Sequence, residues 1–166
     1  MNLPGVALRV ATPRDAPVIQ ALLDDDPATY ALLEGAPPRP DEARLLLAER
    51  PPGVPPRARR VYVADAICVL DLVEGFPQPT TWYLGLIFVA RAARGQGLGT
   101  RLLAATLEHV TARGGETLRL AVVRDHTAAR RLYARLGFTH VRYATKPLWS
   151  GSTQEVEILD RVLTEA

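Results

Sequence analysis

The sequence predicts an α/β protein: an α+β sandwich with a mixed, mostly antiparallel sheet of about seven strands flanked by helices. Strand-like and helical segments follow one another in the order β, α, α, β, β, β, α, β, α, β, β. Three strand-like segments lie in succession between residues 59 and 89, with only short turns between them, which is typical of antiparallel pairing. Apolar residues make up 48% of the chain and charged residues 23%, so a sizeable core can be buried.

The length of 166 residues predicts a single domain over 1–166. The longest apolar stretch, residues 84–90, is far shorter than the ~20 residues that cross a bilayer, and no export signal is recognisable, so no membrane contact is expected. The 20 basic and 18 acidic residues nearly balance, which argues against nucleic acid as a partner. Cys68 is the single cysteine and has no intramolecular partner, which favours the cytoplasm.

The first third of the chain is predicted to hold one strand and two helices. Residues 5–11 form the strand, and Thr12-Pro13 then supplies a helix cap and a proline at the first helical position. Apolar residues recur at helical spacing over 18–23, and the pattern ends at 24–27. The chain from there to Pro40 is expected to be irregular, and a short helix over 41–50 follows. Prolines keep this region outside the sheet.

The remaining elements are predicted from apolar residues that alternate in strands or recur at helical spacing, and from glycines that end helices. The helices are bounded by capping residues and by Gly114-Gly115 or Gly137. Strands are predicted at 59–64, 67–74, 80–89, 118–123, 138–144 and 155–163, and helices at 97–113 and 125–136.

A glycine-rich loop over residues 89–101 joins a strand to a helix. Its glycines let backbone amides approach a bound group, and the helix start adds unpaired N–H groups, so a pyrophosphate is the expected ligand. A P-loop is excluded because it needs a lysine here and the one lysine is Lys146. A dinucleotide-binding loop fits poorly because Thr100 stands where its third glycine belongs.

The pattern that remains, Arg94-x-x-Gly97-x-Gly99, resembles the acetyl-CoA motif of the GCN5-related N-acetyltransferase (GNAT) family. A second segment, residues 126–138, is similar to that family's Asn-x-x-Ala-x-x-Leu-Tyr-x-x-x-Gly-Phe pattern, with His126 in place of the asparagine. The specific residues lie between about Leu84 and Phe138, while the order of elements agrees with the family over roughly the whole chain.

The resemblance implies acetyl-CoA as co-substrate and no metal. The pantetheine arm would lie along the strand before the loop, and the pyrophosphate would meet the loop amides, with Arg94 adding a charge-assisted contact. His126 could hydrogen-bond the pantetheine. The implied coenzyme-binding residues are Ile87, Phe88, Val89, Arg94, Gly95, Gln96, Gly97, Leu98, Gly99, Thr100 and His126.

The resemblance also implies the catalytic groups. Tyr133 occupies the family's general-acid position, where it would stabilise the departing thiolate. The attacking amine must lose a proton, and Glu74 is the first candidate base, with Asp71 and a water chain as alternatives. A main-chain N–H near Phe88 would stabilise the oxyanion.

The predicted function is acetyl transfer to a primary amine of a small molecule or of a peptide N-terminus. The acceptor site is expected at residues 24–40 and 146–152, walled by aromatic residues, with the acidic run 24–26 attracting a cationic amine. Two alternatives stay open: a catalytically silent CoA-binding module, and transfer of another acyl group or transfer to oxygen. A homodimer is compatible with the fold, but no interface is recognisable. The four candidate wall residues are Tyr30, Trp82, Tyr83 and Trp149.

Overall fold

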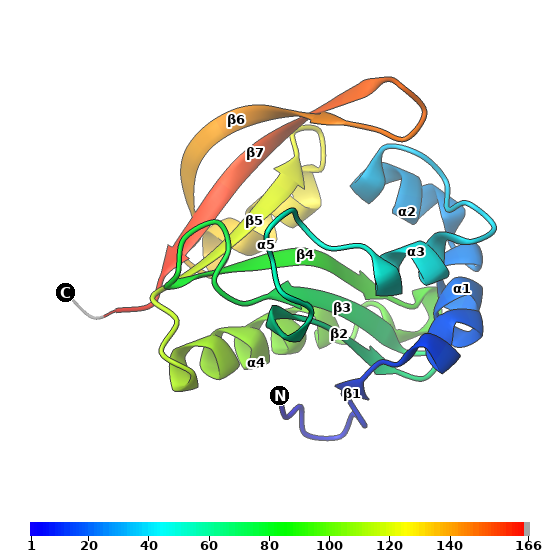
Figure 1. Ribbon diagram of the computed structural model, residues 1–166, viewed down its shortest axis with the longest axis horizontal. Helices are drawn as coiled ribbons and strands as arrows, with labels where there is room; N and C mark the ends of the chain where they lie inside the picture. The colour runs from blue at the N-terminus through cyan, green and yellow to red at the C-terminus, as the bar shows by residue number, and fades with distance from the viewer. Residues whose placement is uncertain (165–166) are drawn as a thin grey trace.

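The computed structural model describes residues 1–164 and has a seven-stranded sheet with helices on both faces (Figure 1). The strand order is β1-β2-β3-β4-β5-β7-β6. Neighbouring strands are antiparallel except β4 and β5, which are parallel. The predicted fold class is therefore confirmed. The strands are β1 (Arg9–Val10), β2 (Arg59–Ala64), β3 (Cys68–Val73), β4 (Thr81–Val89), β5 (Thr117–Val123), β6 (Thr139–Pro147) and β7 (Thr153–Val162); the helices are α1 (Ala16–Asp24), α2 (Pro27–Glu34), α3 (Glu42–Ala48), α4 (Leu98–Ala112) and α5 (Thr127–Arg135).

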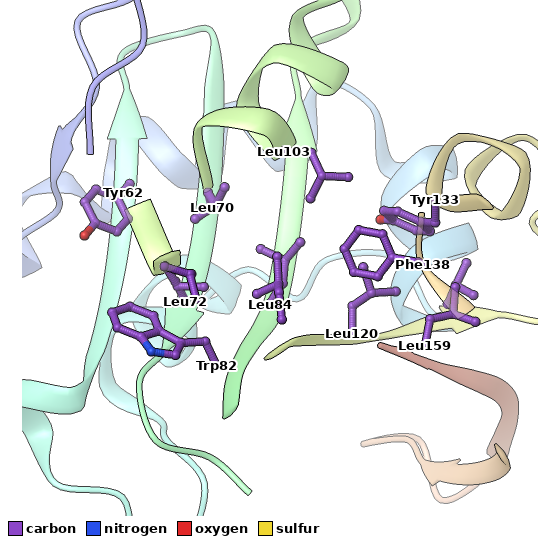
Figure 2. Packing of buried hydrophobic residues seen from close by; sticks show 13 residues of the cluster. Tyr62, Leu70, Leu72, Trp82, Leu84, Leu103, Leu120, Tyr133, Phe138 and Leu159 are labelled. Atoms are coloured by element: carbon purple, nitrogen blue, oxygen red, sulfur yellow. The ribbon is translucent and has the colours of Figure 1, made fainter. Parts of the chain in front are cut away.

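Each face of the sheet carries its own apolar core. On one face, Leu103 of α4 and Tyr133 of α5 pack against sheet residues that include Leu70 and Leu84, as Figure 2 shows. On the other face, α1, α2 and α3 cover a second cluster that includes Ile19 and Phe88. Removing these apolar side chains from water is the main source of stability for the layered arrangement.

The alternation of side chains along the strand β4 is interrupted in the middle of the strand. Leu84 packs in the core under α4 and α5, whereas Leu86 packs in the core under α1 to α3. Strict alternation would put both side chains on one face, and the extra residue Gly85 breaks it, because Leu72 pairs with Leu84 while Asp71 pairs with Leu86. The bulge lies where the functional site begins.

The segment expected to be irregular contains the helix α2, so that prediction was wrong. Pro27 stands at the first helical position, where its missing N–H costs nothing, and Asp26 caps the helix by accepting a hydrogen bond from the Thr29 N–H at 3.3 Å. Gly35 ends it in the left-handed conformation. The predicted strand over 5–11 is also shorter than expected, since only Arg9–Val10 pair with β2.

None of the helices in residues 1–164 has both the length and the hydropathy needed to cross a membrane. Over the same residues, His, Cys, Asp and Glu side chains form no group of three or more that is placed to hold a metal ion.

Candidate active site

A cleft opens where the parallel strands β4 and β5 separate. The two strands pair from Thr81 with Thr117 to Leu84 with Leu120. Beyond these pairs, β4 and β5 are not paired with each other. Figure 1 shows β5 rising away from β4 beyond this point. Beyond Leu84, main-chain groups of β4 that do not face β3 are therefore open to a ligand, apart from the Val89 carbonyl, which accepts a hydrogen bond from Arg94.

Two connected cavities occupy the cleft. The larger is an open groove of about 630 Å³ between β4, the glycine loop and α5. The smaller, about 40 Å³, lies between β4, β5, α2 and α5. They share four lining residues: Leu33, Ile87, Ala129 and Tyr133. A long ligand in the groove would thus end beside Tyr133.

The glycine loop forms the cradle at the outer end of the groove. Gly95 and Gly97 have left-handed φ angles of 76° and 73°, and Gly97 is the N-cap residue of α4, with no side-chain cap on the first turn of the helix. A Cβ added to Gly95, Gly97 or Gly99 would meet no protein atom within 4 Å, so the glycines leave space that a ligand can fill. Open amides at a helix start, with space in front of them, fit a pyrophosphate.

Arg94 lines the groove and also forms contacts within the protein. Its Nε donates to the Val89 carbonyl at 2.9 Å, and its terminal nitrogen bonds the Asp26 carboxylate and the Thr29 hydroxyl. The guanidinium also lies 5.5 Å from the Phe88 ring centroid. The Arg94 guanidinium thus ties the loop to α2, and its other terminal nitrogen has no hydrogen-bond partner in the described residues, so the charge-assisted phosphate contact stays a prediction.

The Asp26 carboxylate is the group that holds Arg94. It is buried, so it is not available to attract a cationic acceptor as expected for the acidic run 24–26. It is 4% exposed and also accepts from the exposed Arg91 at 3.3 Å. Hydrogen bonding from Thr29, together with the Arg94 guanidinium, holds the pKa of Asp26 well below its usual range. Arg91 therefore helps to anchor the glycine loop.

Tyr133 stands where the two cavities meet. Its ring packs edge-on against Phe138 at 5.6 Å between centroids, beside Leu120 in Figure 2, and the residue is 9% exposed. Burial raises the pKa of Tyr133 to about 12, so its hydroxyl remains a proton donor at neutral pH.

The other predicted coenzyme-binding residues divide into two groups. The strand residues Ile87–Val89, the loop glycines, Leu98, Thr100 and His126 all line the groove, whereas the exposed Gln96 does not. His126 caps α5 by accepting the Ala129 N–H at 3.5 Å. Burial lowers the pKa of His126, so a neutral imidazole faces the groove.

The structure does not bring Glu74 to the site. Ile87 pairs with Leu70, and Glu74 lies four residues further along the strand direction, about 13 Å away at the usual rise. Glu74 lines neither cavity and forms ion pairs with Arg60 at 3.5 Å and Arg113 at 3.4 Å. The geometry therefore argues against Glu74 as the base.

Asp71 lies next to the bulge, close to the smaller cavity. A Cβ added to Gly85, which lines that cavity, would come within 2.5 Å of an Asp71 carboxylate oxygen. Asp71 is 8% exposed and accepts a hydrogen bond from Arg59 at 2.8 Å. Burial is the largest influence and raises the pKa of its carboxyl, although Arg59 acts in the opposite direction.

The aromatic residues expected around an acceptor do not all lie there. Trp82 is 3% exposed and packs in the core, where Val110 and Gly115 are its neighbours. Tyr30 is also buried, with its hydroxyl bonded to Glu42 at 3.0 Å. Trp149 is 59% exposed in the β6–β7 turn. Trp82 therefore cannot limit the size of a bound acyl group.

The sequence predicted that residues 24–40 contribute to the acceptor site, but it did not single out the α2 residues that line the cavities. Thr29 and Leu33 line the groove, and Glu34 lines the smaller cavity with Tyr133. Glu34 accepts a hydrogen bond from Lys146 of β6 at 2.7 Å. The signal that could have revealed this helix is local: Asp26, Pro27 and Thr29 form a helix start.

Comparisons with known proteins agree with the architecture and the motifs. Residues 22–138 match the model of the acetyltransferase (GNAT) family. The chain is 31% identical over 77 residues to N-alpha-acetyltransferase 30 of Schizosaccharomyces pombe, a stretch that covers 46% of this chain and 50% of that protein. The chain thus spans about half the length of this curated relative.

Solved structures are similar over nearly the whole chain. An acetyltransferase from Thermus thermophilus superposes with a TM-score of 0.70 at 25% identity, covering 98% of this chain and 100% of that one. Spermidine N-acetyltransferase from Vibrio cholerae, solved with CoA and spermine, has a TM-score of 0.73 at 19% identity and 95% coverage of both chains.

Proposed function

Because the chain belongs to the GNAT family of acetyltransferases, we propose that it transfers the acetyl group of acetyl-CoA to a primary amine of a small molecule or a peptide N-terminus. One observation carries the proposal: the groove at the glycine loop and the small cavity at the β4–β5 separation meet at Tyr133. A coenzyme that lies along the groove would deliver its thioester to that point. The two similar proteins are named as an N-alpha-acetyltransferase and a spermidine N-acetyltransferase, which supports an amine acceptor.

Acetyl-CoA supplies the activated acetyl thioester, and the main chain holds it. The free edge of Ile87–Val89 would pair with the amide groups of pantetheine, and the amides from Gly95 to Thr100 would bind the pyrophosphate. The small cavity of about 40 Å³ has room for roughly three water-sized groups, which favours acetyl over a long acyl chain.

Tyr133 is the proposed acid. A thiol with a pKa of about 8.5 is a stronger acid than a phenol whose pKa is about 12, so complete proton transfer to the thiolate is uphill. The hydroxyl therefore acts mainly by a hydrogen bond that strengthens as negative charge develops on sulfur.

Asp71 is the proposed base, acting through a water at Gly85. An acceptor ammonium has a pKa near ~10.4 and must lose a proton before it attacks. Asp71 is buried directly behind Gly85, and the raised pKa of its carboxyl makes it a better proton acceptor than an exposed aspartate. A water in contact with both groups would carry the proton.

The test is a calorimetric titration with acetyl-CoA, with ADP and a long-chain acyl-CoA as comparisons, followed by thiol release with a panel of amines. Selective binding of acetyl-CoA and amine-dependent thiol release are expected. Binding without release for any amine would favour a CoA-binding module instead. Absence of binding to every CoA species would refute the proposal.

A further inference from the structure

The single lysine of the chain is held at the edge of the candidate active site. Lys146 lies on β6, and its ammonium donates to the Glu34 carboxylate at 2.7 Å, across 112 positions of sequence. Glu34 in turn lines the small cavity together with Ile87 and Tyr133. One carboxylate therefore separates this primary amine from the cavity that would receive the acetyl group.

Packing of the β6–β7 turn keeps Lys146 near this position. The Leu148 side chain covers Gly35 so closely that an added Cβ would lie 2.6 Å from it, and the Arg39 guanidinium lies 5.5 Å from the Trp149 ring centroid. Figure 1 shows this end of the hairpin above α2. The turn therefore presents Lys146 to the cavity edge while its backbone stays anchored.

The Lys146 side chain itself is not locked. It is 40% exposed and the Glu34 side chain is 26% exposed, so the ion pair is accessible to water and can be exchanged at little cost. A lysine side chain also has several rotatable bonds through which its amine can move once the pair opens.

From this placement we infer that Lys146 is an acetyl acceptor within its own chain, a self-acetylation site that rests on the proposed function. The Lys146 ammonium gives one proton to Glu34, and from there the proton passes to solvent. The free amine attacks the thioester carbonyl, an N–C bond forms and the C–S bond breaks. The second nitrogen proton ends on the CoA thiol, so the products are acetyl-Lys146 and CoA.

Intramolecular placement makes the reaction competitive with acetylation in solution. A reacting group held near its target acts at an effective concentration far above that of a free amine. Glu34 adds a proton acceptor in direct contact with the nucleophile. The product amide has no charge, so self-acetylation also removes the ion pair that joins α2 to β6.

The test is intact-mass and peptide-mapping mass spectrometry of the purified chain before and after incubation with acetyl-CoA. One acetyl group on Lys146 is expected, at a first-order rate that does not change with protein concentration. Lys146→Arg should remove the added mass.

Two further variants separate catalysis from simple reactivity. Glu34→Gln should slow acetylation of Lys146 on the order of 100-fold, the usual range for loss of a general base, and Tyr133→Phe should slow it as well. Glu108→Gln, which removes an exposed carboxylate from α4, should leave the rate unchanged.

Several results would overturn the inference. Lys146 could remain unmodified in a protein that binds acetyl-CoA and acetylates added amines, in which case the proposed function stands and self-acetylation fails. A rate that rises with protein concentration, or that is the same in Tyr133→Phe, would also refute it. A chain that binds no acetyl-CoA would refute both proposals.

Discussion

The Arg94 guanidinium and the Asp26 carboxylate form an ion pair that joins the glycine loop to the first turn of α2. The Asp26 side chain is only 6% exposed, and the same carboxylate caps α2 through the Thr29 N–H. One buried acid thus connects the proposed pyrophosphate site with the helix that carries Leu33 and Glu34 into the small cavity.

Asp26→Asn is expected to weaken both the fold and coenzyme binding. The amide keeps one acceptor oxygen for the cap but leaves Arg94 without its counter-charge, so a loss of about 1 to 3 kcal/mol in the free energy of unfolding is expected. The loosened loop should raise the Kd for acetyl-CoA. Urea denaturation and calorimetric titration measure the two effects. The exposed neighbour Asp25→Asn is the control, and equal losses in both variants would contradict the prediction.

Gly97→Ala is expected to weaken acetyl-CoA binding at least about tenfold, or ~1.4 kcal/mol, because the new Cβ projects into space that the ligand needs. The left-handed backbone also costs about 1 kcal/mol of stability. Gly53→Ala is the matched control: Gly53 has a φ of 78° and equally open surroundings but lies away from the groove. It should lose similar stability and bind normally. Equal binding by the two variants would show that the pyrophosphate does not lie at Gly97.

Tyr133→Phe is expected to lower kcat on the order of 100-fold while the Kd for acetyl-CoA stays nearly constant. The phenylalanine ring preserves the contact with Phe138, so the variant should fold. Steady-state kinetics with an accepted amine and a binding titration provide the two readouts. Tyr143→Phe, at a residue that is 54% exposed, serves as control. An unchanged kcat would remove Tyr133 from the mechanism.

Gly85→Ala is expected to destabilise the protein by about 2 kcal/mol, since its Cβ would overlap the Asp71 carboxylate at 2.5 Å. Asp71 is fixed by its ion pair with Arg59, so it cannot move aside cheaply. In an Asp71→Ala background the same substitution should cost less. Urea denaturation of the four proteins in this cycle gives the coupling energy, and additive effects would contradict the proposed contact.

Stability is expected to fall on acidification in part because of His109. Its ring is packed edge-on against Tyr62 and Trp82, its Nε2 is buried without a hydrogen-bond partner, and burial lowers its pKa. The unfolded chain therefore binds the proton more readily, and as pH falls below about 6.5 the folded state is increasingly disfavoured.

The measurement is the urea midpoint of wild type and His109→Phe between pH 8 and pH 5. The variant should lack the His109 contribution, so the difference in stability between the two proteins should grow in favour of the variant as pH falls. Other titrating groups cancel in this difference. A difference that does not vary with pH would contradict the lowered pKa.

The sequence by itself determined most of the elements and the glycine loop proposed to bind the coenzyme. Glycines at a helix start, a tyrosine at helical spacing and strand-like alternation are local features, and each has a local physical cause. The resemblance to the GNAT family assigned the loop glycines and Ile87–Val89 to the coenzyme and Tyr133 to the thiolate, and in the structure these residues line one groove. The missed helix α2 was also encoded locally, but its proline was interpreted as a break instead of a first helical residue.

Only the tertiary structure decided which partners the charged side chains take. Arg94 meets Asp26 across 68 positions and Lys146 meets Glu34 across 112, and neither pairing follows from spacing along the chain. Strand register places Asp71 behind the bulge, whereas Glu74 follows the end of β3 and pairs with Arg60 and Arg113, although both acids come from one strand region. Side-chain charge interactions depend on distance in space, so the preference for Asp71 over Glu74 and the anchor of the glycine loop followed only from the packed structure.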